Sequence, residues 1–132
     1  MNPSADARRA LSSATLAGEQ ISAEGTFPVD LAVFSGHFPG HPLVPGVAVI
    51  ALIQAACEQV FCAAIRIAVV ERCKWKTPTV PGERLQLNII AGAADENQQR
   101  RIKATITNAT GVACEAHLVI VINDKNYGAA GR

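Results

Sequence analysis

The chain has 132 residues, of which 49% are hydrophobic and 17% are charged, and its formal net charge at pH 7 is +1. This length and apolar content suit one globular domain around a single core. The scattered lysines and arginines form no basic stripe, which argues against a nucleic-acid-binding protein. We therefore predict a single domain, residues 1–132, with no nucleic-acid partner.

The four cysteines have neither Cys-x-x-Cys spacing nor a histidine at a zinc-finger interval. They fall in apolar or strand-like stretches, where a reduced thiol packs as a small hydrophobic group. We predict buried free thiols, no disulfide, no metal site and no cofactor. The residues are Cys57, Cys62, Cys73 and Cys114.

The first part of the chain, residues 1–14, is a polar amino-terminal segment. Within it, "ADARRALSS" is long enough for two helical turns. The segment contains no apolar stretch of the length that a signal peptide needs, so we expect a cytoplasmic protein. The following "LAGEQISAEGTFPVD", residues 16–30, predicts a first strand that ends near Pro28.

Residues 34–46, "FSGHFPGHPLVPG", combine three prolines, three glycines and two histidines. One glycine or one proline is sufficient for a turn, because each solves a single dihedral problem. Six of them predict a rigid loop that holds a fixed shape. We interpret His41 as a solvent-facing residue of this loop and consider His37 for chemistry below.

A helix is predicted over residues 46–65, "GVAVIALIQAACEQVFCAAI", with Pro45 as its starter. The segment has no proline and no internal glycine, and its apolar residues extend nearly all the way round. Gln54, Glu58 and Gln59 interrupt the run, so we do not expect a membrane span. A helix of this kind must be covered on most sides.

Four strands are predicted after the helix, joined by turns at "VPGER", "DENQQ" and "NATGV". Apolar and polar residues alternate in "ERLQLNI" and "RIKATIT", which indicates one buried and one wet face. We predict an α+β fold in which the long helix lies across a curved antiparallel sheet of about five strands. The exposed sheet edge favours dimerisation. The four strands cover residues 66–78, 83–95, 98–110 and 111–123, and residues 123–132 form a loose tail.

The rigid loop leads into the first turn of this helix, where backbone amides have no partner within the helix. Gly46 has no side chain, so its amide can approach a ligand carbonyl closely and polarise it. A polarised carbonyl makes the adjacent carbon acid easier to deprotonate. An imidazole with a pKa of about 6.5 is a suitable base near neutral pH, which makes His37 a candidate catalytic residue.

The loop "GHFPGHPLVPGV" closely resembles the active-site turn of the 3-hydroxyacyl-(acyl-carrier-protein) dehydratases of the hot-dog fold. The later "KWKTPTVPGERL" is also similar to that family. In the family a basic residue, an aromatic, a lysine and a Pro-Gly turn followed by an acid occupy this stretch. Here Trp75 stands where phenylalanine is usual and Glu83 where aspartate is usual. The resemblance covers residues 21–122.

The resemblance implies a thioester dehydratase that produces a trans-2-enoyl thioester in fatty-acid or polyketide-type synthesis. His37 would remove the proton alpha to the thioester, and the Gly46 amide would polarise the carbonyl. The implied partners are an acyl carrier protein or a coenzyme A thioester, together with a second hot-dog subunit in a homodimer or heterodimer. We expect Gly46, Val47, Phe38 and Gln54 to contact the substrate.

The family also has a carboxylic acid on the helix, fourteen residues after its histidine, which protonates the departing hydroxyl. In this chain that position is Ala51. Gln54 does not titrate. Glu58 is the nearest carboxylate on the same face, about 10 Å further along the axis. We interpret His117 as an ordinary strand residue.

Three interpretations therefore remain open. The chain is an active dehydratase or hydratase that uses His37 with water or with Glu58; or it is one subunit of a heterodimer whose partner supplies the acid. The third is that it binds acyl thioesters or carrier proteins without catalysis.

Overall fold

The computed structural model of the chain describes residues 3–29 and 44–123. The predicted loop residues His37, Phe38 and His41 lie outside the described residues, as does the predicted tail from residue 124 onward. In chain order the elements are α1 (Pro3–Ala10), β1 (Leu11–Ala17), β2 (Gln20–Thr26), α2 (Gly46–Phe61), β3 (Ala64–Trp75), β4 (Arg84–Ala91), β5 (Gln99–Asn108) and β6 (Gly111–Asn123).

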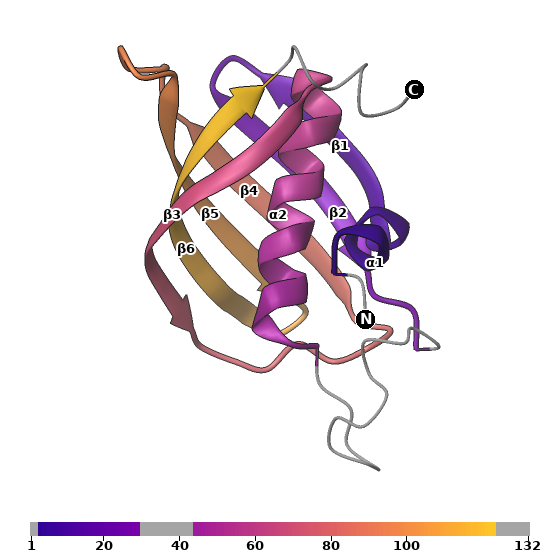
Figure 1. Ribbon diagram of the computed structural model, residues 1–132. Coiled ribbons are helices and arrows are strands. Elements are labelled where there is room, and N and C mark those ends of the chain that lie inside the picture. The colour runs from indigo at the N-terminus through magenta and orange to yellow at the C-terminus, as the bar shows by residue number, and fades with distance from the viewer. Residues whose placement is uncertain (1–2, 30–43, 124–132) are drawn as a thin grey trace.

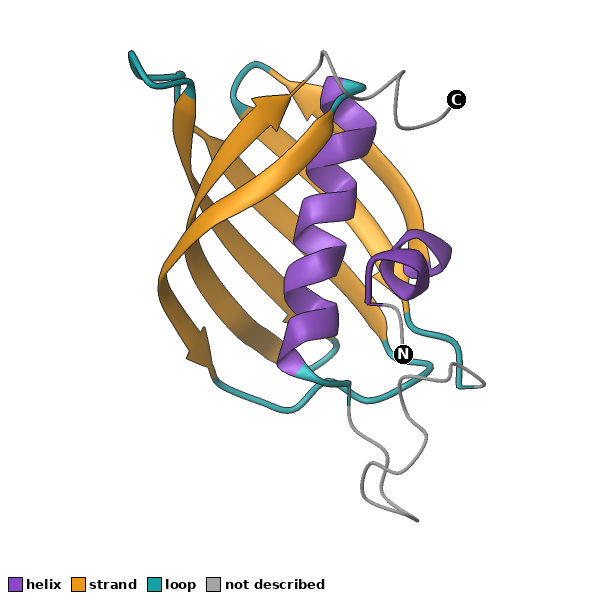
Figure 2. Cartoon of the chain, in the orientation of Figure 1, coloured by secondary structure: helices purple, strands orange, loops and turns teal. Residues whose placement is uncertain are grey.

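The strands form one antiparallel sheet in the order β1-β2-β4-β5-β6-β3. Figures 1 and 2 show this sheet curving around α2, which crosses its concave side. The predicted α+β architecture, with a long helix wrapped by a curved antiparallel sheet, is confirmed. Among the described strands, β1 and β3 are therefore the two edges of the sheet.

The sheet has six strands, one more than predicted. The strand predicted over residues 16–30 corresponds to β2, which forms a hairpin with the additional strand β1. Gly18 adopts a φ of +63°, which a glycine tolerates and which allows the chain to reverse between β1 and β2. Ala17 pairs directly with Gln20 across this turn. The sequence prediction missed β1 because most of its side chains are small or polar and exposed, so no alternation marks it.

Helix α2 is shorter than predicted and ends at Phe61. Cys62 adopts the left-handed conformation, with φ of 50° and ψ of 46°, and the Ala63 amide donates to the Glu58 carbonyl at 3.4 Å. A left-handed residue of this kind stops a helix. Ala64 and Ile65, predicted as the last helical residues, therefore open β3 instead.

The core lies between α2 and the concave face of the sheet. Eight of the sixteen α2 residues are buried. The alternation predicted in β4 and β5 is confirmed, since Leu85 and Leu87 are buried, as are Ile102, Ala104 and Ile106. Helix α1 packs beside α2 and contributes further buried alanines (Figure 1). The buried α2 residues are Ala48, Val49, Ala51, Leu52, Ile53, Ala55, Ala56 and Cys57.

The cysteine prediction is correct in part. Cys57 and Cys114 are buried free thiols, as expected, and Cys73 is half-buried. Cys62 is exposed, which contradicts the prediction, because it lies at the helix end that turns out to solvent rather than within the helix. None of the helices within the described residues is long and apolar enough to cross a membrane.

The edge strand β3 pairs only with β6 and is irregular. The pairing shifts register twice, between Ile67 and Val69 and between Val70 and Arg72. Such bulges bend a strand and increase its twist. Val69 and Val70, which lie between the two shifts, are 48% and 50% exposed, so the free edge carries apolar side chains.

The alternation in β4 gives a test of the core assignment. Ile89 is fully buried, whereas its neighbour Ile90 is 45% exposed. We expect Ile89→Ala to lower the free energy of unfolding by about 2–5 kcal/mol, because it leaves a cavity beneath α2. Ile90→Ala should cost less than about 1 kcal/mol. Urea denaturation of both variants measures the difference, and equal losses would contradict the assignment.

Candidate functional site

A mostly apolar hollow of about 350 Å³ lies at the start of α2. Its walls come from the residue that enters the helix, from the first turn of the helix, and from the end of β3 with the loop that follows. The residues around it are Val44, Gly46, Val49, Trp75, Lys76, Thr77, Pro78 and Thr79. The hollow thus joins two segments that are far apart in sequence and that the sequence analysis had each related to the same family.

Backbone hydrogen bonds fix the frame of this hollow. The Val44 amide donates to the Thr79 carbonyl at 2.7 Å, which ties the helix entry to the loop after β3. The amides of Lys76 and Thr77 both donate to the Ala113 carbonyl, at 2.8 and 3.2 Å. Because these bonds involve main-chain atoms only, the frame does not depend on flexible side chains.

Gly46 is packed directly beneath the indole of Trp75. A Cβ added at Gly46 would lie 2.9 Å from Cζ2 and 3.3 Å from Cη2 of the ring. Real Cβ atoms do not approach other atoms so closely, so any larger residue at this position would force the indole to shift. Trp75 itself remains 49% exposed and forms the outer wall of the hollow.

Helix α2 begins without a side-chain cap. Pro45 precedes the first turn in an extended conformation, and that turn carries no acidic residue. The amides of Ala48 and Val49 donate to the Pro45 carbonyl, at 3.0 and 3.3 Å, whereas those of Gly46 and Val47 find no acceptor within the described part of the chain. Free amides at the positive end of a helix dipole favour a carbonyl oxygen that gains negative charge.

Gly46 lines this hollow, whereas Val47 and Gln54, the other described candidates for substrate contact, do not. Val47 is 54% exposed beside it, and Ala51, one turn later, is 7% exposed and belongs to the core. No carboxylate is among the described residues that line the hollow. The position of the family's helix acid is therefore occupied by a buried methyl group.

Gln54 and Glu58 lie toward the opposite end of α2, where both side chains bind the backbone of Ile65 at the start of β3. The Gln54 side-chain amide donates to the Ile65 carbonyl, and the Ile65 amide donates to Glu58 Oε2 at 3.1 Å. The other oxygen of Glu58 lies 3.8 Å from Arg8 of α1. Glu58 is about 18 Å from Gly46 along the helix axis, at about 1.5 Å per residue. These contacts give both residues a structural task.

The buried thiols are poorly suited to nucleophilic chemistry. Burial raises the pKa of Cys57 and of Cys114 to about 12, and the neighbouring carboxylate of Glu58 adds to the effect on Cys57. Cys73 Sγ lies 3.9 Å from Cys114 Sγ, and burial also raises the pKa of Cys73. A thiol, rather than a thiolate, is a weak nucleophile at neutral pH.

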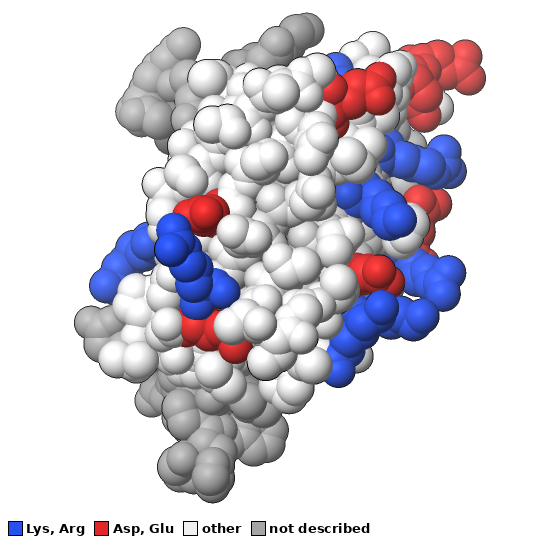
Figure 3. Space-filling model, turned by 180° about the vertical axis from the view of Figure 1, so that it is seen from behind, with Lys and Arg blue, Asp and Glu red and all other residues white. Residues whose placement is uncertain are grey.

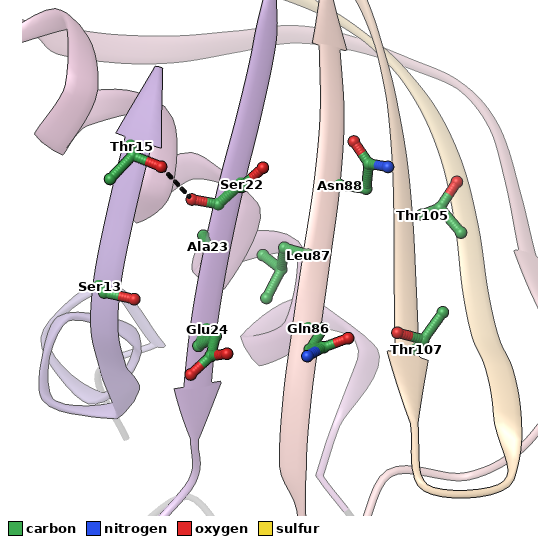
Figure 4. A pocket seen from close by; sticks show the side chains of 10 residues that line it. All are labelled: Ser13, Thr15, Ser22, Ala23, Glu24, Gln86, Leu87, Asn88, Thr105 and Thr107. Atoms are coloured by element: carbon green, nitrogen blue, oxygen red, sulfur yellow. Dashed lines mark hydrogen bonds between the residues drawn. The ribbon is translucent and has the colours of Figure 1, made fainter. Parts of the chain in front are cut away.

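A second hollow, of about 440 Å³, lies on the outer face of the sheet (Figure 4). Figure 4 shows hydroxyl and amide side chains from four neighbouring strands around it, with Thr15 donating to the Ser22 carbonyl at 3.5 Å. Its one carboxylate, Glu24, is bound by Arg84 at 2.7 Å, and this hydrogen bond and positive charge lower the pKa of Glu24. The hollow contains no predicted site residue and no base with a raised pKa, and we assign it no part in the chemistry.

A sequence profile described as ApeI dehydratase matches residues 13–116. The chain belongs to the ApeI-like dehydratase family. The match includes residues 34–46, α2 with Ala51, and the stretch from Trp75 to Glu83. It confirms the resemblance on which the sequence interpretation depended.

Individual relatives agree with membership of the ApeI-like dehydratase family. A 3-hydroxyacyl-(acyl-carrier-protein) dehydratase FabZ of Haemophilus influenzae is 32% identical over 117 residues, which cover 77% of this chain and 74% of that protein. The dehydratase heterocomplex ApeI:P from Xenorhabdus doucetiae has a chain that matches with a TM-score of 0.62 at 24% identity, covering 80% of this chain and 89% of that one. A Streptococcus mutans protein bound to acetyl-CoA matches with a TM-score of 0.64 at 10% identity, covering 87% and 88%. The fold is the hot-dog fold.

Sequence reasoning missed the part of the hollow that follows β3. Thr77 and Pro78 were predicted as the end of a strand, Thr79 stood only within the stretch that resembles the family, and Trp75 was noted only as a mild departure from the family pattern. The sequence offered two signals for this contact. Gly46 begins the helix, and the large aromatic Trp75 follows the basic Lys74 on β3. Their contact is a tertiary one, and no spacing in the sequence encodes it.

The contact between Gly46 and Trp75 makes a specific prediction. We expect Gly46→Ala to lower the free energy of unfolding by about 1–3 kcal/mol, because the new methyl group overlaps the indole. Trp75→Phe removes the ring atoms that the methyl group would meet. In the Trp75→Phe background Gly46→Ala should therefore cost less, and a double-mutant cycle by urea denaturation measures this coupling. Additive effects would show that the two residues do not pack as described.

The structural task of Glu58 makes a second prediction. Glu58→Ala leaves the half-buried Ile65 amide without its acceptor and should cost about 1–3 kcal/mol. Glu58→Gln keeps an acceptor oxygen and loses only the partly exposed pair with Arg8, which is worth at most about 1 kcal/mol. Thermal and urea unfolding of both variants checks the order. Equal losses would mean that the charge, and not the hydrogen bond to Ile65, is what Glu58 contributes.

Proposed function

We propose that the chain is a 3-hydroxyacyl-thioester dehydratase subunit that eliminates water to give a trans-2-enoyl thioester. The observation that carries the proposal is the mostly apolar hollow lined by Gly46, whose amide has no acceptor within the described residues, in a chain of the ApeI-like dehydratase family. A thioester carbonyl oxygen that accepts from this amide would be polarised, and the acyl chain would lie against Trp75 and Val49. Polarisation lowers the cost of removing the proton on the adjacent carbon.

In this proposal His37 is the base. Its imidazole takes the proton from the carbon alpha to the thioester, and a double bond forms between the alpha and beta carbons. The bond from the beta carbon to its hydroxyl oxygen breaks, and the hydroxyl leaves as water after it receives a proton from an acid. Gly46 holds the carbonyl, and Phe38 and Val47 are the other proposed substrate-binding residues, whereas the Gln54 amide is bound to the Ile65 carbonyl and is left out of the proposed site.

The acid is the group that this chain lacks within its described residues near the hollow. Ala51 cannot donate a proton, and Glu58 is bound to Ile65 and Arg8 about 18 Å from Gly46 along the helix. These contacts favour the interpretation in which a partner subunit supplies the acid over the one in which Glu58 supplies it. The chain would then contribute His37 and Gly46 to a site completed by its partner.

The free edge of β3 supports a partner of this kind. The strand carries exposed valines and ends at Trp75, beside the hollow, so a subunit that pairs along it would reach the proposed site. The relative from Xenorhabdus doucetiae is described as a heterocomplex. We propose a homologous hot-dog subunit as partner and an acyl carrier protein or coenzyme A as the carrier of the thioester, in the cytoplasm.

A second candidate function is thioester or carrier-protein binding without catalysis. The observation that favours it is the buried methyl group of Ala51 at the position of the family's acid. Both candidates use the same hollow, so they differ in turnover and not in binding.

The missing acid can be restored to separate these functions. We expect the wild-type chain alone to hydrate a crotonyl thioester slowly, and Ala51→Glu to raise the rate by at least about a hundredfold, the usual contribution of a positioned general acid or base. Gln59→Glu places the same group at an exposed position of α2 and should leave the rate unchanged.

Two further variants complete this experiment. Ala51→Glu combined with His37→Ala should return the rate to that of the wild-type chain, because the base is then absent. Circular dichroism and thermal unfolding establish that Ala51→Glu remains folded, and Ala51→Gln supplies a matched uncharged side chain. A folded Ala51→Glu variant with no gain in rate, in a chain that still binds the thioester, would favour the binding function.

A further inference from the structure

We propose that β3 selects a partner strand that carries carboxylates and disfavours pairing with a second copy of this chain. The inference rests on the proposed pairing along β3, but it concerns which partner is chosen and not which reaction follows. It is carried by the positions of the charges on this edge strand and by the contacts that the nearby carboxylates already make.

Three cations project from the outer face of β3. Arg66, Arg72 and Lys74 are exposed and stand opposite Val121, His117 and Glu115 of β6, which share one face of that strand. His117 in turn stands opposite Lys103 of β5. Arg72, His117 and Lys103 therefore form a row of basic side chains across three strands. Figure 3 shows lysine and arginine side chains gathered along this side of the outer face.

The carboxylates on this face are already engaged. Glu71 accepts from Arg101 at 3.3 Å, and Glu115 lies 3.7 Å from Lys76. Within the described part of the chain, Arg66, Arg72 and Lys74 make no ion pair of their own. The charges of these three side chains therefore remain available to an anionic neighbour at the edge of the sheet.

The start of β3 limits where a partner strand can pair. Gln54 and Glu58 occupy the carbonyl and amide of Ile65, so these groups are not free for another chain. The open part of the edge begins beyond Ile65 and includes Val69 and Val70, the exposed apolar side chains that a partner would cover. A pairing that buries both valines must be centred close to them.

Pairing with a second copy is unfavourable for a geometric reason. In a two-fold symmetric antiparallel pair, residues equally far from the centre face each other, and each contact occurs twice. If the two-fold axis passes at Val69, Arg66 of one chain faces Arg72 of the other. If the axis passes at Val70, Arg66 faces Lys74 of the other chain. Each of these registers therefore gathers four cations from two copies around the valines. A partner with glutamate or aspartate at the facing positions replaces this repulsion by attraction.

A charge-reversed copy of the chain is a suitable probe because it keeps the fold and the valines. The variant carries Arg66→Glu, Arg72→Glu and Lys74→Glu. We expect the wild-type chain and this variant, mixed in equal amounts, to form a one-to-one complex at least about tenfold tighter than either forms with itself. Native mass spectrometry and sedimentation of differently tagged chains measure the two kinds of complex.

The dependence of association on salt gives an independent readout. Self-association of the wild-type chain should strengthen as salt is added, because screening weakens repulsion, whereas the mixed complex should weaken. Lys103→Glu, on the same outer face but two strands from the edge, is the matched control and should change the preference little. Circular dichroism verifies that every variant is folded.

Two results would overturn the proposal. One is a wild-type self-complex as tight as the mixed complex; the other is self-association that salt weakens. These experiments measure association and not catalysis, so their failure would not contradict the dehydratase proposal. In the same way, an inactive Ala51→Glu variant would not contradict the proposed partner selection by β3.

Discussion

Burial of α2 against the concave face of the sheet is the constraint on which the other features of the molecule depend. Half of the helix residues are buried, mostly alanines and branched aliphatic side chains, and the six strands supply the matching surface. Alanines allow the sheet to approach the helix closely, while Leu52 and Ile53 fill the space between the layers. Once the helix is enclosed in this way, each of its two ends is fixed relative to β3.

The two ends of α2 meet β3 through different contacts and serve different purposes. At the end of the helix, Gln54 and Glu58 bind the backbone of Ile65 and hold the strand where it begins. At the start of the helix, Trp75 covers Gly46 where the strand finishes. The strand is thus anchored at one end by polar groups and closed at the other by an aromatic ring. Gly46, whose amide has no acceptor within the described residues, lines the hollow beside this ring.

Strand β3 also has two faces with separate roles. Its inner side contributes Ile65 and Trp75 to the core and the hollow, whereas its outer side carries the cations that have no acidic partner within the described residues. Two register shifts lie in the middle of the strand. Val69 and Val70, which lie between these shifts, are exposed at the edge of the sheet. The replacement of the family's helix acid by Ala51 and the cations on this edge both bear on the subunit that we propose to pair along β3.

The sequence by itself determined the long helix after Pro45, the alternating strands from Arg84 to Asn108, the α+β class and the absence of an acid at position 51. These features are local, because periodicity and turn residues act over a few neighbours in the chain. Only the tertiary structure decided that residues 16–30 contain half of a hairpin, that Cys62 ends the helix, and that Glu58 binds Ile65 rather than reaching the hollow. It also brought Trp75 onto Gly46. Such contacts join residues distant in sequence, and they exist only once the sheet has closed around the helix.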